Sequence, residues 1–239
     1  MPPERLETAV VLAGGLGTRL GELTARAPKP LMPVKGRPFL EHLLVMLGRH
    51  GISEVILLTG YLGEQIEAYF GSGRALDLTI RYSREPAPCG TGGALRLASD
   101  LLPAEFFLVY GDSYLDTGYQ AAYRAFHAGR LPGASGLMVV TPLEAVPDAV
   151  GNVRLGPGGG TVASYEKGRG GDHRFVDAGV LILSREVVGW LPAHGSSALE
   201  ELVYPRLARE GRLLAFPSGT RFYDIGTPER LAVFERVIA

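Results

Sequence analysis

The sequence has little cysteine, no block of basic residues and no long apolar run, and each absence narrows the class of protein. A single cysteine, Cys89, among 239 residues excludes an internal disulfide and fits a reducing compartment. There is no apolar signal core and no run of about 18 apolar residues. The formal net charge is −1. We therefore expect a cytoplasmic protein with neither nucleic acid nor a membrane as its partner.

Apolar segments of strand and helix character alternate along the chain. This alternation indicates βαβ units in a parallel sheet with right-handed crossovers. Hydrophobic residues make up 46% and charged residues 21%, and no linker or internal repeat interrupts them, so we expect one continuous α/β fold. The expected strands are 9–13, 54–59, 76–82, 106–110, 136–141, 153–155, 162–165, 175–183, 213–216 and 222–224. The expected helices are 39–50, 62–70, 94–101, 119–127, 197–210 and 228–237.

The first strand ends in a glycine-rich loop. Gly14, Gly15 and Gly17 lack the Cβ atoms that would keep an anion away from backbone N–H groups, and Arg19 follows with a permanent positive charge. The spacing fits neither the GxxxxGK[ST] loop nor the GxGxxG dinucleotide fingerprint. A phosphate-binding loop and a simple turn with a surface arginine both remain compatible with this stretch.

Three further charged residues stand at constrained positions. Lys29 lies between two prolines, which restrict its backbone. Asp112 and Asp224 each end an apolar strand, where ligands of parallel sheets bind. Two carboxylates at strand ends suit Mg²⁺, although a lone aspartate there is also a common turn cap. If these groups share one site with Arg19, the implied chemistry is transfer at phosphorus.

Six motifs occur in order: LAGGLGTRL, PKPLMPV, GTGGAL, a GD pair after an apolar strand, an EK pair and DIGTPE. Together they resemble the sugar-1-phosphate nucleotidyltransferases, also called nucleoside-diphosphate-sugar pyrophosphorylases. The chain is most similar to short bacterial guanylyltransferases of mannose-1-phosphate or D-glycero-D-manno-heptose-1-phosphate. The resemblance implies a Rossmann-like three-layer α/β/α fold with a mixed, mainly parallel central sheet. It also implies a single domain over 1–239, with a nucleotide-binding half of about 1–118 and a sugar-phosphate-binding half of about 119–239.

The resemblance assigns roles to individual residues on the nucleotide side. Arg19 stabilises the leaving pyrophosphate, Lys29 contacts the phosphates at the reacting centre, and Asp112 and Asp224 bind Mg²⁺. The residues implied to bind the nucleotide are Leu12, Ala13, Gly14, Gly15, Gly17, Thr18, Glu85, Gly90 and Thr91.

On the acceptor side, the resemblance implies that Glu166 binds sugar hydroxyls, Lys167 binds the sugar phosphate and Gly151 backs the sugar. The chain departs from the family where an NAG triplet is usual, because Asp177 replaces the asparagine. An ionised carboxylate there would accept hydroxyl hydrogen bonds and donate none. We therefore expect an acceptor that differs from the usual hexose phosphates.

The expected reaction joins a nucleoside triphosphate to a sugar-1-phosphate with release of pyrophosphate. Glu85 favours GTP, because a carboxylate accepts from both N1–H and N2–H₂ of guanine. A uridylyltransferase acting on N-acetylmuramate-1-phosphate or a hexose-1-phosphate stays open, as does a catalytically silent regulatory subunit that binds nucleotide sugars. The oligomeric state is also left open, since the apolar C-terminal helix suits a second copy of the chain as well as the core.

Overall fold

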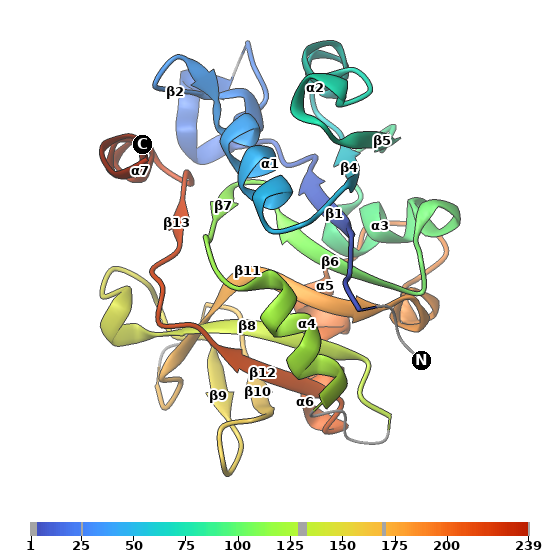
Figure 1. Cartoon of the computed structure of the whole chain (residues 1–239), viewed down its shortest axis with the longest axis vertical. Coiled ribbons are helices and arrows are strands. Elements are labelled where there is room, and N and C mark those ends of the chain that lie inside the picture. The colour runs from blue at the N-terminus through green and yellow to red at the C-terminus, as the bar shows by residue number, and fades with distance from the viewer. Residues whose placement is uncertain (1–3, 25, 129–132, 169–170, 239) are drawn as a thin grey trace.

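A mixed sheet runs through the protein in a computed structural model that describes residues 4–24, 26–128, 133–168 and 171–238 (Figure 1). Within these ranges the sheet has nine strands. They are β1 (Thr8–Ala13), β4 (Glu54–Thr59), β5 (Thr79–Arg84), β6 (Glu105–Tyr110), β8 (Gly136–Pro142), β9 (Val153–Leu155), β10 (Val162–Tyr165), β11 (Phe175–Ser184) and β12 (Leu213–Pro217).

The order of the strands places a crevice beside β1. Strand β1 pairs in parallel with β4 on one side and with β6 on the other, and β5 extends the parallel part beyond β4. The chain therefore reverses its direction of travel across the sheet between β1 and β6, and ligands of such sheets bind outside the carboxyl ends of these strands. Strand β11 runs antiparallel to β6 and β8, which makes the sheet mixed, as the resemblance implies.

Helices cover both faces of the sheet. They are α1 (Phe39–Arg49), α2 (Gly63–Phe70), α3 (Gly90–Leu97), α4 (Tyr119–Ala128), α5 (Leu199–Leu202), α6 (Tyr204–Arg209) and α7 (Pro228–Val237). Ala9 and Val11 of β1 pack in one buried cluster with α1, α4 and α7, whereas Val10 packs in a second cluster with α3, α5 and α6. The uninterrupted apolar run of β1 follows from this burial on both faces. The expected three-layer α/β/α fold is confirmed.

Several expected boundaries are wrong. The helix expected at 94–101 is α3, which begins at Gly90, so the glycines of GTGG form its first turn instead of a loop. The strand expected at 76–82 is β5, which lies later and follows a short 3₁₀ turn. The helix expected at 197–210 is two short helices, because Pro205 has no N–H to bond the preceding turn. The first of these helices, α5, has Ala198 as its N-cap, so the serine expected at the start of this segment does not cap it.

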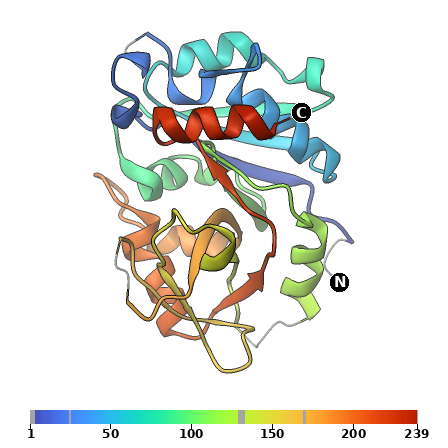
Figure 2. The same ribbon diagram turned by 90° about the vertical axis from the view of Figure 1, so that its left-hand side faces the viewer.

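The C-terminal segment returns to the N-terminal half of the chain (Figure 2). Strand β13 (Tyr223–Asp224) pairs with β7 (Ser113–Tyr114) as a separate two-stranded ribbon, so that Asp224 lies opposite Ser113. Helix α7 then packs Phe234 against Phe39 of α1, with ring centroids 5.0 Å apart. The predicted Thr227 cap of α7 is confirmed, since its hydroxyl accepts from the backbone N–H of Arg230. None of the helices in the described ranges could cross a membrane.

Replacing Phe234 with alanine should destabilise the protein by about 3–5 kcal/mol, because its ring is fully buried among the rings of Phe39, Tyr114 and Tyr223. Urea denaturation measures the free energy of unfolding. Val237 on the same helix is 50% exposed, so Val237→Ala serves as the control and should change stability by less than about 0.5 kcal/mol. Equal effects of the two substitutions would contradict this packing.

Candidate active site

A cavity of about 290 Å³ opens at the carboxyl ends of β1 and β6. Most residues that the sequence predicts to bind nucleotide line it, together with Lys29 and Asp112, whereas Gly17 and Thr18 do not. The complete lining is Leu12, Ala13, Gly14, Gly15, Leu16, Lys29, Pro30, Leu58, Glu85, Pro88, Gly90, Thr91, Ala94, Tyr110, Gly111 and Asp112. The structure therefore brings the glycine loop and the GTGG segment to one cavity.

The glycines of the first loop are needed for different reasons. A Cβ on Gly14 would lie 2.9 Å from Glu85 Oε1, and one on Gly17 would lie 3.0 Å from Lys29 Cβ. Gly17 also has φ of +66°, which L side chains rarely adopt. Gly15 has open space around it, so its backbone is the part of the loop that a ligand can approach closely. Packing of Glu85 and Lys29 thus accounts for two of the three glycines.

Glu85 is held at one wall of the cavity. Its Oε2 accepts hydrogen bonds from the backbone N–H of Cys89 at 3.0 Å and from the thiol at 2.8 Å. Burial, reinforced by the neighbouring carboxylate, raises the pKa of the Cys89 thiol to about 12, so the thiol keeps its proton. The other carboxylate oxygen lies beside Gly14 and Gly60. Glu85 is therefore fixed in orientation before any ligand enters.

A charged centre lies at the Asp112 end of the cavity. The buried Lys29 ammonium contacts Asp112 Oδ2 at 2.5 Å. The backbone N–H of Ile225 donates to the backbone oxygen of Asp112 at 3.0 Å, which draws β13 alongside. Asp224, which directly precedes Ile225, contacts Arg230 at 2.7 Å. Its Oδ1 accepts from the backbone N–H of Gly226, two residues further on.

Arg19 reaches this centre from the first loop. A Cβ built on Gly226 would lie 3.3 Å from Arg19 Nη2 and 2.7 Å from Asp224 Oδ1, so the exposed guanidinium lies beside Asp224. The four residues that the sequence predicts at the reacting centre, Arg19, Lys29, Asp112 and Asp224, thus gather in one region. Among the described residues, no group of three or more His, Cys, Asp or Glu side chains suits a metal ion.

A second charged cluster borders the cavity through Thr91 and Tyr110. The Thr91 hydroxyl donates to Glu200 Oε2 at 2.6 Å, and Lys167 Nζ donates to Glu200 Oε1 at 3.2 Å. Glu200 is only 6% exposed. Burial alone would raise the pKa of Glu200, but hydrogen bonds from Thr91, from its own backbone N–H and from Lys167 outweigh it and lower the pKa. The buried Glu200 is therefore an ionised link between Thr91 at the cavity wall and Lys167.

Three tyrosines complete this cluster. The hydroxyls of Tyr110 and Tyr204 lie 3.2 Å apart, and Tyr165 packs edge-on against Tyr204 with ring centroids 5.3 Å apart. Burial raises the pKa of all three hydroxyls, so each stays neutral and able to donate a hydrogen bond. The sequence did not predict a role for the tyrosines or for Glu200. Glu200 could not be told apart from its neighbour Glu201, which is the same residue type but is exposed in the structure.

Asp177 lies at an irregularity of β11. The register between β11 and β8 shifts between Asp177 and Leu181, and Gly179 has φ of +76°. The Gly179 N–H donates to Asp177 Oδ1 at 2.9 Å, and the Asp177 N–H donates to Asn152 Oδ1 at 2.9 Å. Burial raises the pKa of Asp177 to about 7. The hydrogen bond from the Gly179 N–H lowers this pKa, the charge of Glu200 raises it, and the charge of Lys167 lowers it. Bulges that reorient a side chain are frequent beside active sites.

The other residues that the sequence predicts to bind the acceptor lie near this bulge. A Cβ on Gly151 would overlap the backbone oxygen of His173, so close packing alone requires glycine there. The backbone N–H of Glu166 donates to the backbone oxygen of Asn152 at 2.9 Å, which places Glu166 next to Gly151 in space. Its neighbour Lys167 reaches Glu200, as described above.

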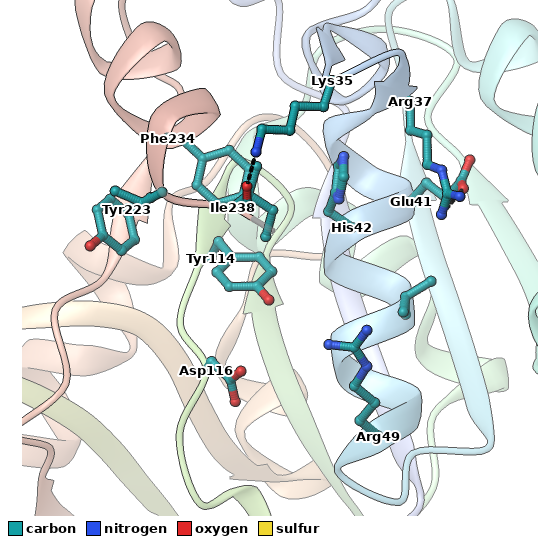
Figure 3. Close-up of a pocket in the computed structure, with 12 residues that line it drawn as sticks. Lys35, Arg37, Glu41, His42, Arg49, Tyr114, Asp116, Tyr223, Phe234 and Ile238 are labelled. Atoms are coloured by element: carbon teal, nitrogen blue, oxygen red, sulfur yellow. Dashed lines mark hydrogen bonds and ion pairs between the residues drawn. The ribbon is translucent and has the colours of Figure 1, made fainter.

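A larger hollow of about 600 Å³ lies elsewhere, between α1, β7 and α7 (Figure 3). Lys35, His42 and Arg49 line it together with Tyr114 and several other side chains. It contains none of the residues that the sequence predicts to be functional, so size alone does not identify the active site.

The model of the nucleotidyl transferase family matches residues 8–237, so the chain belongs to this family. Mannose-1-phosphate guanylyltransferase of Mycobacterium tuberculosis (strain ATCC 25618 / H37Rv) is 35% identical over 223 residues, which are 92% of this chain and 61% of that protein. D-glycero-alpha-D-manno-heptose 1-phosphate guanylyltransferase of Aneurinibacillus thermoaerophilus is 47% identical over 90 residues, 38% of this chain and 39% of that protein.

Solved structures agree with this assignment. HddC from Yersinia pseudotuberculosis, in a crystal structure complexed with GMP-PN, has a TM-score of 0.78 and 28% identity. The match covers 95% of this chain and 97% of that chain. The chain spans 61% of the length of the mannose-1-phosphate guanylyltransferases that it matches. The family resemblance seen in the sequence is confirmed.

Replacing Asp177 with asparagine should change how stability depends on pH. The pKa of Asp177 rises from 3.8 to about 7 on folding, so the folded protein binds this proton more tightly than the unfolded chain does. Wild-type stability therefore falls as pH rises through this interval, whereas asparagine does not titrate. The variant should gain up to roughly 3–4 kcal/mol relative to wild type between about pH 4 and pH 8. Urea denaturation across this pH range measures the difference, and parallel curves would contradict the protonation.

Proposed function

We propose that the protein transfers a nucleotidyl group from a nucleoside triphosphate to a sugar-1-phosphate and releases pyrophosphate. GTP is the favoured donor, and D-glycero-D-manno-heptose-1-phosphate or mannose-1-phosphate is the favoured acceptor. The observation that carries the proposal is the position of the Lys29–Asp112 pair at the end of the nucleotide cavity, beside Asp224 and Arg19. The named guanylyltransferases among the relatives support the same reaction.

The chemistry follows from charge. A sugar-1-phosphate is largely dianionic near neutral pH, since its second pKa is about 6, so its oxygen needs no general base. That oxygen bonds to the α-phosphorus of the triphosphate while the bond from the α-phosphorus to the bridging oxygen of pyrophosphate breaks. Lys167 holds the acceptor phosphate, Lys29 offsets repulsion between the two anions, and Arg19 stabilises the departing pyrophosphate.

Asp112 and Asp224 suit a divalent cation. Asp112 directly precedes β7 and Asp224 lies on the paired strand β13, so both offer hard carboxylate oxygens in one region. Mg²⁺ is commonly held by one or two protein carboxylates with phosphates and waters completing the shell. In the proposed function these two residues hold Mg²⁺. When bound, the ion neutralises phosphate charge. Lys29 and Arg230 contact the same carboxylates, so a metal ion would compete with them.

Base selection is assigned to Glu85. Its carboxylate is oriented by Cys89 at the wall of the cavity, where it would accept from N1–H and N2–H₂ of guanine. The complex of HddC with GMP-PN supports a guanine nucleotide as the donor. We assign the nucleotide to about 1–118 and the sugar phosphate to about 119–239 of a single domain. Location in the cytoplasm stays a prediction.

The purified protein should release pyrophosphate when GTP, Mg²⁺ and heptose- or mannose-1-phosphate are all present. A matrix of GTP, UTP, CTP and dTTP against mannose-, heptose-, glucose- and N-acetylmuramate-1-phosphates, read by coupled pyrophosphate detection, identifies both substrates. If the protein prefers UTP and N-acetylmuramate-1-phosphate, it is a uridylyltransferase, and the proposed substrates GTP and heptose- or mannose-1-phosphate are wrong. Binding of nucleotide sugars without release in any combination would indicate a regulatory subunit.

The same assay tests the reacting centre. Asp112→Asn keeps an oxygen acceptor for Lys29 and should lower kcat by at least about 100-fold, the usual scale for losing a preorganised charged contact. Asp100 lies exposed on a distant turn, so Asp100→Asn is the control and should leave kcat unchanged. Near-normal activity of the Asp112 variant would remove this residue from the site.

Glu85→Gln should lower kcat/KM for GTP by about 10–100-fold, because one charge-assisted acceptor pair on guanine is lost. The value for UTP should change little. Measuring both triphosphates at fixed acceptor concentration gives the ratio, and Glu64→Gln on the exposed part of α2 is the control. An equal loss for both triphosphates would show that Glu85 shapes the cavity without reading the base.

A further inference from the structure

Asp224 has a basic partner that takes no part in the proposed reaction. Arg230, in the first turn of α7, donates from Nη1 to Asp224 Oδ2 at 2.7 Å. The backbone N–H of Gly226 donates to the other oxygen, Oδ1, at 2.8 Å. Both carboxylate oxygens of Asp224 are therefore engaged within the chain, one of them by a permanent positive charge.

A divalent cation on Asp224 would meet this charge directly. A guanidinium in contact with Oδ2 lies next to any ion that the same carboxylate binds, and like charges so close repel each other even in water. The guanidinium must therefore move away when a cation binds. The free energy needed to break its contact with Asp224 is subtracted from the affinity for the cation.

Arg230 is better able to move than Lys29, the other cation of the charged centre that contacts a carboxylate. The side chain of Lys29 is 9% exposed, whereas that of Arg230 is 37% exposed. Separating a buried ion pair leaves charges without compensation, which is costly. A partly exposed guanidinium keeps water as a partner during the exchange, so its displacement costs less.

A second carboxylate lies beside Arg230. Its Nη2 donates to the backbone oxygen of Asp148 at 3.3 Å. The Asp148 side chain is 55% exposed, and its Oδ1 accepts from Arg221 at 2.9 Å. An ionised carboxylate accepts several hydrogen bonds, so Asp148 can receive a second guanidinium. Asp148, Asp224, Arg221 and Arg230 all line one small cavity of about 50 Å³, which gives the side chain room to turn between the two acids.

We propose, on the basis of the function above, that Arg230 is a displaceable counter-ion of Asp224, which lowers the affinity of the protein for free divalent cations and moves to Asp148 when a cation binds. Arg230 acts through Asp224 and is therefore a positioning residue. Free Mg²⁺ binds weakly under this competition. Mg²⁺ that arrives with the triphosphate is favoured, because the phosphates supply further oxygen ligands.

The test titrates the purified protein with Mn²⁺ in the absence of substrates and measures free Mn²⁺ by electron paramagnetic resonance. Arg230→Gln should lower the Kd for Mn²⁺ by about tenfold, the scale of one charge-assisted contact at a partly exposed site. Arg230→Lys keeps the competing charge and should stay within about threefold of wild type. Arg236→Gln makes the same change in net charge at an exposed position of α7 and should leave the Kd unchanged.

Two further variants locate the effect. Adding Asp224→Asn to Arg230→Gln should abolish the gain in affinity, because the carboxylate that Arg230 releases is no longer there. Asp148→Asn should raise the Kd by about threefold, because the displaced guanidinium loses its second carboxylate. Glu144→Gln, an exposed acid earlier in the same connection, is the control for this loss of negative charge and should keep the wild-type Kd.

A purely structural Arg230 would give a different result, since Arg230→Gln would then lower the stability of the protein in urea without tightening Mn²⁺ binding. That outcome, or a gain in affinity that persists in the double variant, would overturn the inference while leaving the proposed function intact. The titration requires no turnover. A wild-type protein that turns over no pair of substrates would overturn the proposed function, and the Mn²⁺ affinities would still decide whether Arg230 competes for Asp224.

Discussion

The antiparallel pairing of β13 with β7 is the contact on which the charged centre depends. The hydrogen bond from Ile225 N–H to the Asp112 oxygen joins residues more than a hundred positions apart and places Asp224 beside Asp112. Helix α7 secures this pairing, because Phe234 inserts between Phe39 of α1 and the two tyrosines of the ribbon. A two-stranded ribbon is marginal by itself, so the apolar anchor of the C-terminal helix maintains the geometry of a polar site.

Local pattern explains which parts of this arrangement could be predicted from the sequence. The glycine loop, Lys29 between prolines and the strand-end aspartates are set by backbone constraints that short segments reveal. Glu200 could not be found in this way, since Glu201 beside it has the same residue type and only the fold buries one of them. The early start of α3 was missed for a related reason. The N–H groups of Gly92 and Gly93 donate to the distant Ser197 oxygen, which stabilises a glycine-rich first turn that local propensity disfavours.

Charge compensation differs between the two clusters. At the charged centre, Asp112 and Asp224 each contact a cation of their own, Lys29 and Arg230, which compensates the two neighbouring carboxylates. The chain has a net charge of −1 overall, so attraction of the two anionic substrates proposed above would come from such local cations, including the exposed Arg19.

In the second cluster, the Lys167 ammonium contacts the buried Glu200. Glu200 obtains the ammonium and a hydroxyl donor, which lowers its pKa, and Asp177 is left with a backbone N–H, which does not offset its burial. The pKa values of the two acids therefore move in opposite directions within one cluster, the pattern expected when environment assigns them different roles. Glu200 provides a charge that holds Lys167 in place.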